Sequence, residues 1–354
     1  MKIDKLELKN YRNYEELHLE FDEHTNLLYG DNAQGKTNIL EAIYVCATTK
    51  SHRGSKDKEI IRFDQEESHI KLKVTKNDLP YVIDMHLKKN KTKGIAINSV
   101  PIKKASELFG TIHVVCFSPE DLDLIKNGPA ERRKFINLEL CQLNRLYVHS
   151  LINYNSILIQ KNKLLKEPVL KPEMQDVLDV YDQQLAQYGK EVIQMRAAFI
   201  RELNEIIRDI HFQISDQKEQ IRIVYEPSEI KNMRVEELRA KQTLSGPHRD
   251  DFVFYVNDKE LRKYGSQGQQ RTAALSLKLS EIELVKKKTG EAPILLLDDV
   301  LSELDTGRQN KLLSEIKNIQ TVITCTGLED FVNNNFQITK AMKVEQGTVT
   351  VLEA

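Results

Sequence analysis

The run from Gly30 to Thr37 has the residue types and the spacing, G-x-x-x-x-G-K-T, of a loop that binds the phosphates of a nucleoside triphosphate. Glycine lets the backbone curl so that its N–H groups and the N-terminus of the next helix point at phosphate oxygens. Lys36 would supply a positive charge to the outer phosphates, and the Thr37 hydroxyl would bind Mg²⁺. A chance glycine-rich loop is the alternative interpretation. The predicted phosphate-loop residues are Gly30, Asp31, Asn32, Ala33, Gln34, Gly35, Lys36 and Thr37.

Two consecutive acids, Asp298 and Asp299, end the apolar run 294–297. A buried strand that ends in this way can place one carboxylate on Mg²⁺ and its neighbour beside the attacking water. We assign Asp298 to the metal, together with Thr37, and Asp299 to the water, which makes Asp299 and Lys36 the candidate catalytic residues. For the acid pair alone, a buried strand that ends at solvated acids is an equal alternative.

A second anion site is predicted at the start of a helix whose apolar stripe includes Ala274, Leu277 and Ile282. The residues Ser266, Gly268 and Gln269 lie at its N-terminus, where orphan N–H groups and the helix dipole favour negative charge. This site has no lysine. A chain with two phosphate sites and one lysine-bearing loop suggests that the second site serves a nucleotide held by another copy of the chain.

The elements that must position these residues can be traced from the hydrophobic pattern. Residues 25–29 are typical of a short buried strand, and Ile39, Leu40 and Ile43 recur at helical spacing after the loop. Runs 69–74 and 81–87 resemble antiparallel hairpins, whereas 121–212 is polar, nearly free of glycine and helical in period, with a loop between Pro168 and Pro172. Strand patterns return after residue 220, and the chain closes with alternating strands and helices.

Composition restricts the class of protein without identifying it. The 354 residues carry 52 Lys+Arg against 53 Asp+Glu, and the net charge of -1 excludes a global attraction to nucleic acid or anionic membrane while permitting local patches. Cys46, Cys116, Cys141 and Cys325 are widely spaced and are interpreted as buried thiols of a reducing compartment. Without a leader or an apolar run long enough to span a bilayer, we expect a soluble cytoplasmic protein with no membrane partner.

Several motifs carry a resemblance to a known family. The segment 266–269 resembles the signature sequence of ABC-type ATPase heads, and 302–305 resembles their D-loop. The segment 9–14 is similar to the start of SMC-type DNA-repair heads. The segments 51–53, 117–122 and 245–251 resemble one branch of these ATPases, the RecF family, and this similarity runs through essentially all 354 residues.

The resemblance implies an α/β fold, an ABC-type P-loop ATPase head with a mostly helical second lobe inserted in the middle of the chain. We place the ATPase lobe at 1–120 and 246–354 and the helical lobe at 121–245. It also implies an ATP-dependent head-to-tail homodimer, in which Ser266, Gly268 and Gln269 reach the nucleotide of the partner copy, Asp305 lies near the interface, and Arg12 lies near the phosphates or base. Many ABC ATPases have Glu where this chain has Asp299, and the shorter side chain predicts slow hydrolysis of ATP to ADP and phosphate.

DNA is the expected macromolecular partner. Six lysines and no acid lie between Asp84 and Glu107, a run that could neutralise DNA phosphates or could be a solvated hairpin. These lysines are Lys88, Lys89, Lys91, Lys93, Lys103 and Lys104. Further candidates in the helical lobe are Arg132, Arg133, Lys134, Lys161 and Lys163. No base-reading motif appears, so contacts to the backbone of duplex or gapped DNA are expected.

The cellular role is implied by the resemblance alone. It implies recombinational gap repair and the SOS response, with RecO and RecR as partners that help place RecA on single strands. A transporter ATPase subunit, an SMC-like tether and a small-molecule P-loop kinase are the alternatives. His248 and Arg249, beside Asp250 and Asp251, could suggest a metal or catalytic site, but a polar turn at a lobe junction is the simpler interpretation because no second ligand set accompanies them.

Overall fold

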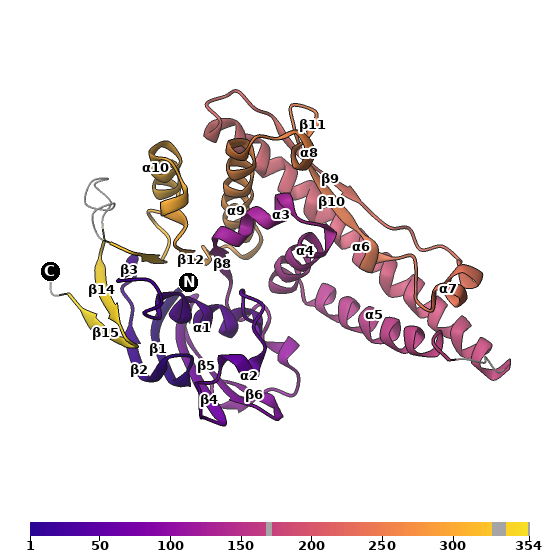
Figure 1. Ribbon diagram of the computed structural model, residues 1–354, viewed down its shortest axis with the longest axis horizontal. Coiled ribbons are helices and arrows are strands. Elements are labelled where there is room, and N and C mark those ends of the chain that lie inside the picture. The colour runs from indigo at the N-terminus through magenta and orange to yellow at the C-terminus, as the bar shows by residue number, and fades with distance from the viewer. Residues whose placement is uncertain (168–171, 328–337, 353–354) are drawn as a thin grey trace. The chain divides into compact units, whose positions relative to one another are not determined.

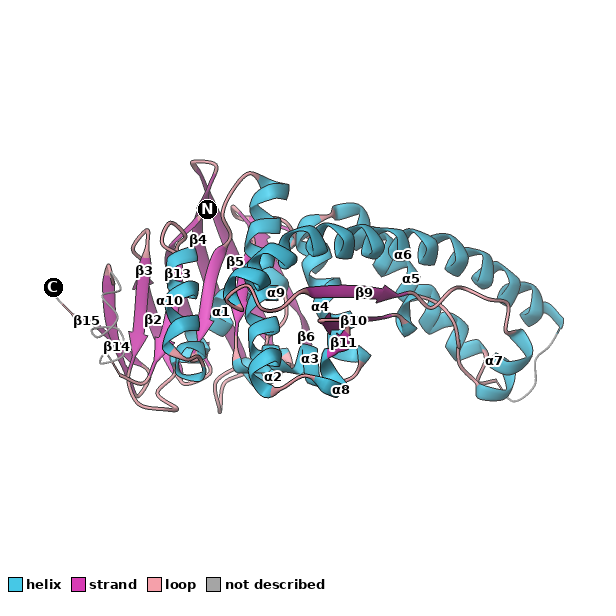
Figure 2. Cartoon of the chain, turned by 90° about the horizontal axis from the view of Figure 1, so that it is seen from above, coloured by secondary structure: helices cyan, strands magenta, loops and turns pink. Residues whose placement is uncertain are grey.

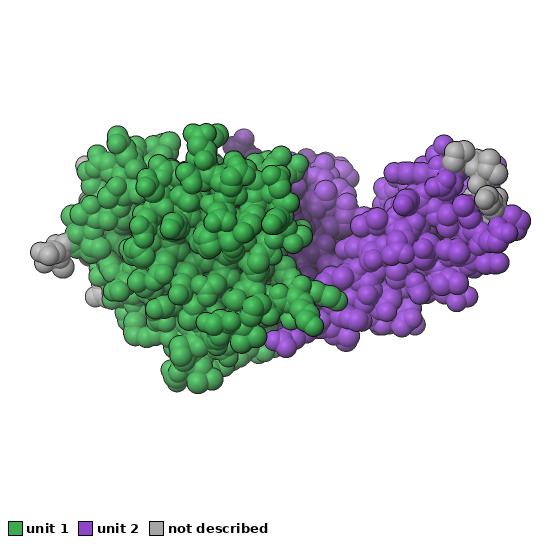
Figure 3. Space-filling model, turned by 90° about the horizontal axis from the view of Figure 1, so that it is seen from below, with its two compact units in different colours: residues 1–121, 275–354 green, residues 122–274 purple. Residues whose placement is uncertain are grey.

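The computed structural model describes residues 1–167, 172–327 and 338–352. The chain divides into two compact units, Met1–Asp121 with Leu275–Ala354 (unit 1) and Leu122–Ala274 (unit 2), which Figure 3 colours green and purple. The first boundary lies one residue from the predicted one. The second lies at 274/275 instead of 245/246, because the strand after residue 250 pairs with the strand at 221–226 and so belongs to unit 2.

Unit 1 contains a largely parallel sheet with the strand order β15-β14-β3-β13-β12-β8. Its strands are β3 (Thr25–Tyr29), β8 (Val114–Phe117), β12 (Ile294–Asp298), β13 (Thr321–Cys325), β14 (Lys340–Glu345) and β15 (Thr348–Val351), with β15 antiparallel to β14. All five residues of β12 are buried, which suits a strand covered on both faces. Helix α1 (Lys36–Thr48) follows β3, and η4 (Val300–Glu303) and α10 (Thr306–Glu315) follow β12.

Unit 1 also contains an antiparallel sheet with the order β2-β1-β4-β5-β6-β7 (Figure 1). Its strands are β1 (Lys2–Tyr11), β2 (Tyr14–Glu20), β4 (Glu67–Lys76), β5 (Leu79–Lys88), β6 (Lys91–Ile97) and β7 (Val100–Pro101). The pairing of β4 with β5 confirms the predicted hairpin. Side chains alternate along these strands, so Leu6, Ile70 and Leu72 join Ile39 and Ile43 of α1 in one core while the opposite face stays polar. The short elements of this unit are α2 (Asp57–Ile60) and η1 (Ala105–Leu108).

Unit 2 is mostly helical. Its helices are α3 (Asp123–Lys126), α4 (Pro129–Leu143), α5 (Arg145–Leu164), α6 (Pro172–Ile214), α7 (Arg234–Ala240) and α8 (Leu261–Tyr264), with η3 (Pro247–Arg249). Helix α6 lies alongside α5 (Figure 1, Figure 2). The strands β9 (Ile221–Glu226), β10 (Asp251–Val256) and β11 (Lys259–Glu260) form a small sheet. The predicted loop at Pro168 lies outside the described residues, and Pro172 begins α6.

Each of the two points in the sequence at which the chain passes from one unit to the other lies within a helical element. The turn η2 (Pro119–Leu122) contains the first boundary, and helix α9 (Gln267–Thr289) contains the second. The predicted signature residues therefore belong to unit 2, whereas the phosphate loop and the acid pair belong to unit 1. None of the helices in the described ranges is both long enough and apolar enough to cross a membrane.

Candidate nucleotide site

The predicted phosphate loop connects β3 to α1, as its sequence requires, and its two glycines allow a close approach. Gly30 has φ +147°, and a Cβ there would lie 2.3 Å from the carbonyl oxygen of Val344. Gly35 has φ +118°, and its Cβ would lie 2.6 Å from Nδ2 of Asn13. Both positions combine a backbone conformation that other residues rarely adopt with a lack of space for any side chain.

Neighbouring segments brace this loop, and sequence reasoning missed them. Asn13, in the turn between β1 and β2, donates through Nδ2 to the carbonyl of Gln34 at 2.8 Å, and the Tyr14 hydroxyl donates to the carbonyl of Gly35 at 3.1 Å. The backbone N–H of Gln346, in the β14–β15 turn, donates to Oε1 of Gln34 at 2.6 Å. No spacing in the sequence links these turns to the loop.

The Lys36 side chain lies over the loop that precedes it. Its ammonium group donates to the carbonyls of Gly30 at 2.7 Å and Asp31 at 2.9 Å, and the residue is only 4% exposed. These bonds fix a positive charge on the inner side of the loop, where the outer phosphates of a nucleotide are expected. The geometry suits the role predicted for Lys36.

Thr37 and Asp298, 261 positions apart, are in direct contact. The Thr37 hydroxyl donates to Oδ1 of Asp298 at 2.8 Å, and the Thr324 hydroxyl donates to the same oxygen at 2.9 Å. Burial disfavours the charged carboxylate, but His52, Thr37 and Thr324 outweigh it and hold the pKa of Asp298 below its usual value. An ionised carboxylate beside a hydroxyl is a set of hard oxygen donors, and it fits Mg²⁺.

The next residue, Asp299, is held in an unusual backbone conformation. Its φ is +51°, in the left-handed region, and its N–H donates to Oγ1 of Thr324 at 2.9 Å. Burial raises the pKa of Asp299, the nearby Lys36 opposes the rise, and the charge of Asp298 adds to it. A carboxylate with a raised pKa is a better acceptor for a proton from water, and the role of Asp299 in hydrolysis stays a prediction.

The signature residues form a reciprocal cap at the start of α9. The Ser266 N–H donates to Oε1 of Gln269 at 2.9 Å, and the Gln269 N–H donates to Oγ of Ser266 at 3.2 Å. Gln269 also donates through Nε2 to Glu219 at 2.9 Å, and the carbonyl of Gly268 accepts from the Thr272 hydroxyl at 2.9 Å. Ser266 is exposed, so this helix N-terminus can be reached by a ligand.

Comparison with known proteins identifies the family. Residues 2–350 match the family model described as RecF/RecN/SMC N terminal domain. The "DNA replication and repair protein RecF" of Lachnoclostridium phytofermentans is 58% identical, with 99% of both chains covered, and that of Agathobacter rectalis is 57% identical over 100% of both. The chain belongs to the RecF family.

Solved structures agree with this assignment. A structure of the recombination mediator protein RecF with ATP, in the RecFOR pathway, has a TM-score of 0.92 and 36% sequence identity to this chain. The match covers 99% of this chain and 97% of the RecF chain in that structure. An SMC head bound to the C-winged helix domain of ScpA has a TM-score of 0.58 at 16% identity, covering 99% and 97% of the two chains. The predicted ABC-type ATPase head fold is confirmed. RecF membership favours DNA repair over the transporter, tether and kinase alternatives.

Arg12 of this RecF family member has a set of protein partners. Its Nε and Nη2 donate to the two carboxylate oxygens of Glu41 at 2.7 Å and 2.6 Å, and Nη1 donates to the carbonyl of Glu59 at 2.8 Å. Glu41 is fully buried on α1, and it also accepts from the Ser51 hydroxyl at 2.5 Å. Arg12 therefore ties the β1–β2 turn to α1, and its contact with a nucleotide stays a prediction.

Two further residues belong to this region of unit 1. His52 is buried, its Nε2 lies 3.8 Å from Oδ2 of Asp298, and neither ring nitrogen has a hydrogen-bond partner among the described residues. In the sequence, the segment 51–53 carries only the family resemblance, and no spacing links His52 to Asp298. Asp305 caps α10, because its Oδ1 accepts the N–H of Arg308 at 3.0 Å, and its place near an interface stays a prediction.

Part of the predicted DNA surface is corrected by the structure. Arg132 is buried and donates through Nε and Nη2 to the two carboxylate oxygens of Asp251 at 2.7 Å and 2.9 Å. Lys161 is buried, and its ammonium group lies 2.6 Å from the carboxylate of Glu237. Each of these two cations is already paired with a carboxylate of unit 2, so neither offers a free charge to a DNA backbone. Among the lysines of the 88–104 run, Lys88, Lys89 and Lys93 pair with acids, whereas Lys91, Lys103 and Lys104 are exposed.

The segment around His248 is a structural turn within unit 2, where a lobe junction was expected. The His248 ring is hydrogen-bonded to the Tyr154 hydroxyl at 2.7 Å through Nδ1 and to the carbonyl of Thr243 at 3.2 Å through Nε2. The two acids that follow, Asp250 and Asp251, are bound to arginines. The polar-turn interpretation is confirmed, and its location is corrected.

Proposed function

We propose that this RecF family member binds ATP with Mg²⁺ through unit 1 and hydrolyses it slowly to ADP and phosphate. The observation that carries the proposal is the contact of Thr37 with Asp298 beside the ammonium group of Lys36. Lys36 would bind the outer phosphates, and Thr37 and Asp298 would hold Mg²⁺, which neutralises phosphate charge. The ATP-bound relative in the RecFOR pathway supports the choice of nucleotide.

Asp299 would act on the attacking water. Its raised pKa suits it to accept a proton, and its short side chain is expected to hold water less closely than a glutamate would. Its left-handed backbone fixes the carboxylate directly after the metal-binding position. These features together favour a weak ATPase that stays in its ATP-bound form for long periods.

The second half of the site would come from another copy of the chain. Ser266, Gly268 and Gln269 form a helix N-terminus without a lysine, exposed at Ser266, which suits an anion whose main cationic partner lies elsewhere. We propose an ATP-dependent homodimer in which these residues contact the partner's nucleotide and Asp305 lies near the interface. The dimer would bind the backbone of duplex or gapped DNA and act in the cytoplasm with RecO and RecR, and through them with RecA.

The test mixes two variants that are defective in different halves of the site. Lys36→Met should lose ATP binding, and Ser266→Arg should bind ATP but stay a monomer by mass measurement. An equimolar mixture contains one intact composite site per heterodimer, so ATP-dependent dimers should partly return. Gln183→Arg, which adds the same charge at an exposed position of α6, serves as the control and should dimerise normally.

Two outcomes would refute the proposal. Unchanged ATP affinity of Lys36→Met would overturn the assignment of the phosphate loop. A Ser266→Arg monomer that hydrolyses ATP at the normal rate would show that one chain completes its own site, and the homodimer would have to be abandoned.

A further inference from the structure

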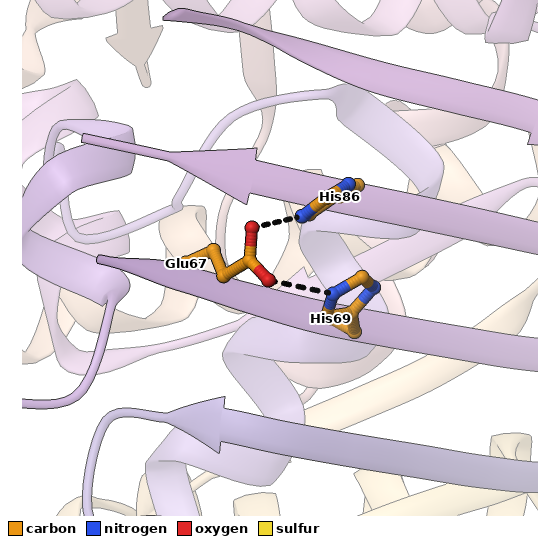
Figure 4. Close-up of side chains that lie close together, drawn as sticks. All are labelled: Glu67, His69 and His86. Atoms are coloured by element: carbon orange, nitrogen blue, oxygen red, sulfur yellow. Dashed lines mark hydrogen bonds and ion pairs between the residues drawn. The ribbon is translucent and has the colours of Figure 1, made fainter. Parts of the chain in front are cut away.

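A cluster of potential metal ligands lies on the polar face of the antiparallel sheet, in unit 1. Glu67 and His69 come from β4 and His86 comes from β5 (Figure 4). One ligand atom from each residue lies within 4.8 Å of the others. The Nε2 atoms of His86 and His69 lie 3.0 Å and 4.0 Å from the two carboxylate oxygens of Glu67. Both imidazoles therefore direct the same nitrogen at one carboxylate.

The sheet itself fixes this arrangement. His69 and His86 are directly opposite each other in the antiparallel register of β4 and β5, and their rings stack with centroids 3.9 Å apart. Glu67 precedes His69 by two positions on the same strand, so its side chain points to the same face. Positions in paired strands are held by backbone hydrogen bonds, and a site built on them needs little reorganisation to accept an ion.

The ionisation of His69 and of Glu67 suits coordination. Partial burial and the neighbouring His86 lower the pKa of His69, which favours the neutral imidazole that a metal requires. Hydrogen bonds from His86 and Lys88 lower the pKa of Glu67, so its carboxylate is anionic. The side chains remain between 33% and 48% exposed, and ions in solution can reach them.

An ordinary ion-pair cluster is the competing explanation, because Nζ of Lys88 lies 3.3 Å from Oε2 of Glu67. Lys88 is the last residue of β5 and its side chain is 38% exposed, so its flexible ammonium group can move aside without leaving a buried charge. A hollow of about 460 Å³ beside the two imidazoles, lined also by His18 and Glu16 of β2, leaves room for water ligands. An ion pair between Glu67 and Lys88 accounts for the carboxylate, but it does not account for the two imidazoles whose Nε2 atoms face the same carboxylate.

We propose that Glu67, His69 and His86 form a binding site for a divalent transition metal, with Zn²⁺ as the ion that fits best. Two imidazole nitrogens and one carboxylate are a ligand set typical of Zn²⁺, and they leave a fourth position for water. Mg²⁺ prefers oxygen ligands in an octahedron, so the site is chemically distinct from the pair Thr37 and Asp298.

The experiment uses the full chain, freed of metal by a chelator and titrated with Zn²⁺ against a chromophoric chelator in the presence of Mg²⁺. One Zn²⁺ per chain is expected. Even the loss of an outer-shell partner weakens metal sites by about 10–100-fold, so His69→Ala and His86→Ala should each lose at least about tenfold in affinity. Co²⁺ should show visible ligand-field absorption bands that both variants lose.

Matched variants separate this site from other metal-binding groups. His18→Ala removes an imidazole from the same polar face, where it pairs with Glu16 at 3.1 Å, and should leave Zn²⁺ affinity unchanged. Asp298→Asn and Cys325→Ser should also leave it unchanged. Glu67→Gln keeps the size of the side chain and should weaken binding without changing the thermal unfolding of the metal-free protein.

The proposal is overturned by either of two results. One is a metal-free chain that takes up no Zn²⁺ in the presence of Mg²⁺. The other is a double variant, His69→Ala with His86→Ala, that folds normally and binds Zn²⁺ as tightly as the unmodified chain does.

Discussion

Replacement of Asp250 by alanine should destabilise unit 2 strongly, because this acid is the partner of a buried cation. Asp250 is 1% exposed and accepts from Nη1 of Arg196 at 2.7 Å. The Tyr225 hydroxyl also donates to its carboxylate, and the Ser228 N–H donates to it at 2.7 Å. One carboxylate thus joins α6, β9 and the loop after β9.

The magnitude follows from what the substitution leaves behind. Arg196 is 2% exposed, and although burial disfavours its charge, Tyr147 and Asp250 raise its pKa above the usual value. Arginine cannot escape by losing its proton, so removing one partner of such a buried pair costs about 3–5 kcal/mol. For a domain of about 150–250 residues each kcal/mol lowers Tm by about 2–4 °C, which predicts a fall of roughly 6–20 °C for the transition of unit 2.

Thermal and urea unfolding, with hydrogen exchange to assign the transition to unit 2, would measure this effect. Asp209→Ala is the matched control, since that acid is exposed on α6, in the same unit, and alanine is compatible with its helical backbone. It should leave Tm nearly unchanged. The reasoning fails if Asp250→Ala lowers Tm no more than Asp209→Ala does. ATP binding retained at low temperature would further show that Asp250 has a structural role.

Three further predictions concern the nucleotide and DNA sites. Gly30→Ala should lower ATP affinity more than tenfold, because the added Cβ would lie 2.3 Å from a backbone oxygen. Gly290→Ala is its control, since Gly290 has φ +76° and no atom within 4 Å of the added Cβ. This control should lower the free energy of unfolding by about 1 kcal/mol and leave ATP affinity unchanged. Asp299→Asn should reduce ATP hydrolysis about 10²-fold or more and lengthen the life of the ATP-bound dimer by mass measurement, and undiminished hydrolysis would move the base elsewhere. Glutamate at the exposed positions Lys91, Lys103 and Lys104 should weaken DNA binding and make it less dependent on salt concentration. The DNA contact is refuted if the slope of log K against log salt concentration is unchanged. Lys161→Gln is unsuitable as a control because that lysine is buried.

The contact between Thr37 and Asp298 in unit 1 could be predicted because each residue lies in a short sequence motif. The spacing from Gly30 to Thr37 and the acids after residue 297 specify a strand, a loop and a second strand of one parallel sheet. Since the carboxyl ends of parallel strands meet at one edge of a sheet, the sequence alone predicts that Thr37 and Asp298 meet across 261 positions. These short motifs predict the contact because the strand-and-loop arrangement they specify is shared by proteins that bind phosphates in this way.

The predictions were wrong where a side chain is bound to a partner that is distant in the sequence and lies in no recognisable motif. Arg132 and Lys161 lie on helices rich in charge, where a basic side chain is normally solvated, and their partners Asp251 and Glu237 are 119 and 76 positions away. Local composition cannot show such a pair. The boundary at 245/246 was wrong for a related reason, because the pairing of β10 with β9 is a long-range contact that assigns the strand to unit 2.

The hydrogen-bonded cap at the start of α9 supports the proposal that this helix N-terminus is the second half of the nucleotide site. Because Oγ of Ser266 accepts the N–H of Gln269, the hydroxyl keeps its own hydrogen for donation, and the reciprocal bond from the Ser266 N–H holds both side chains at the helix N-terminus. A donor held in this way loses little entropy when an anion arrives. Unit 1 contributes an ammonium group that is already fixed by two carbonyls, whereas unit 2 contributes neutral donors and a helix dipole. In the proposed homodimer the phosphate chain of ATP would contact both kinds of group, one from each molecule, and dimerisation would therefore depend on the intact triphosphate.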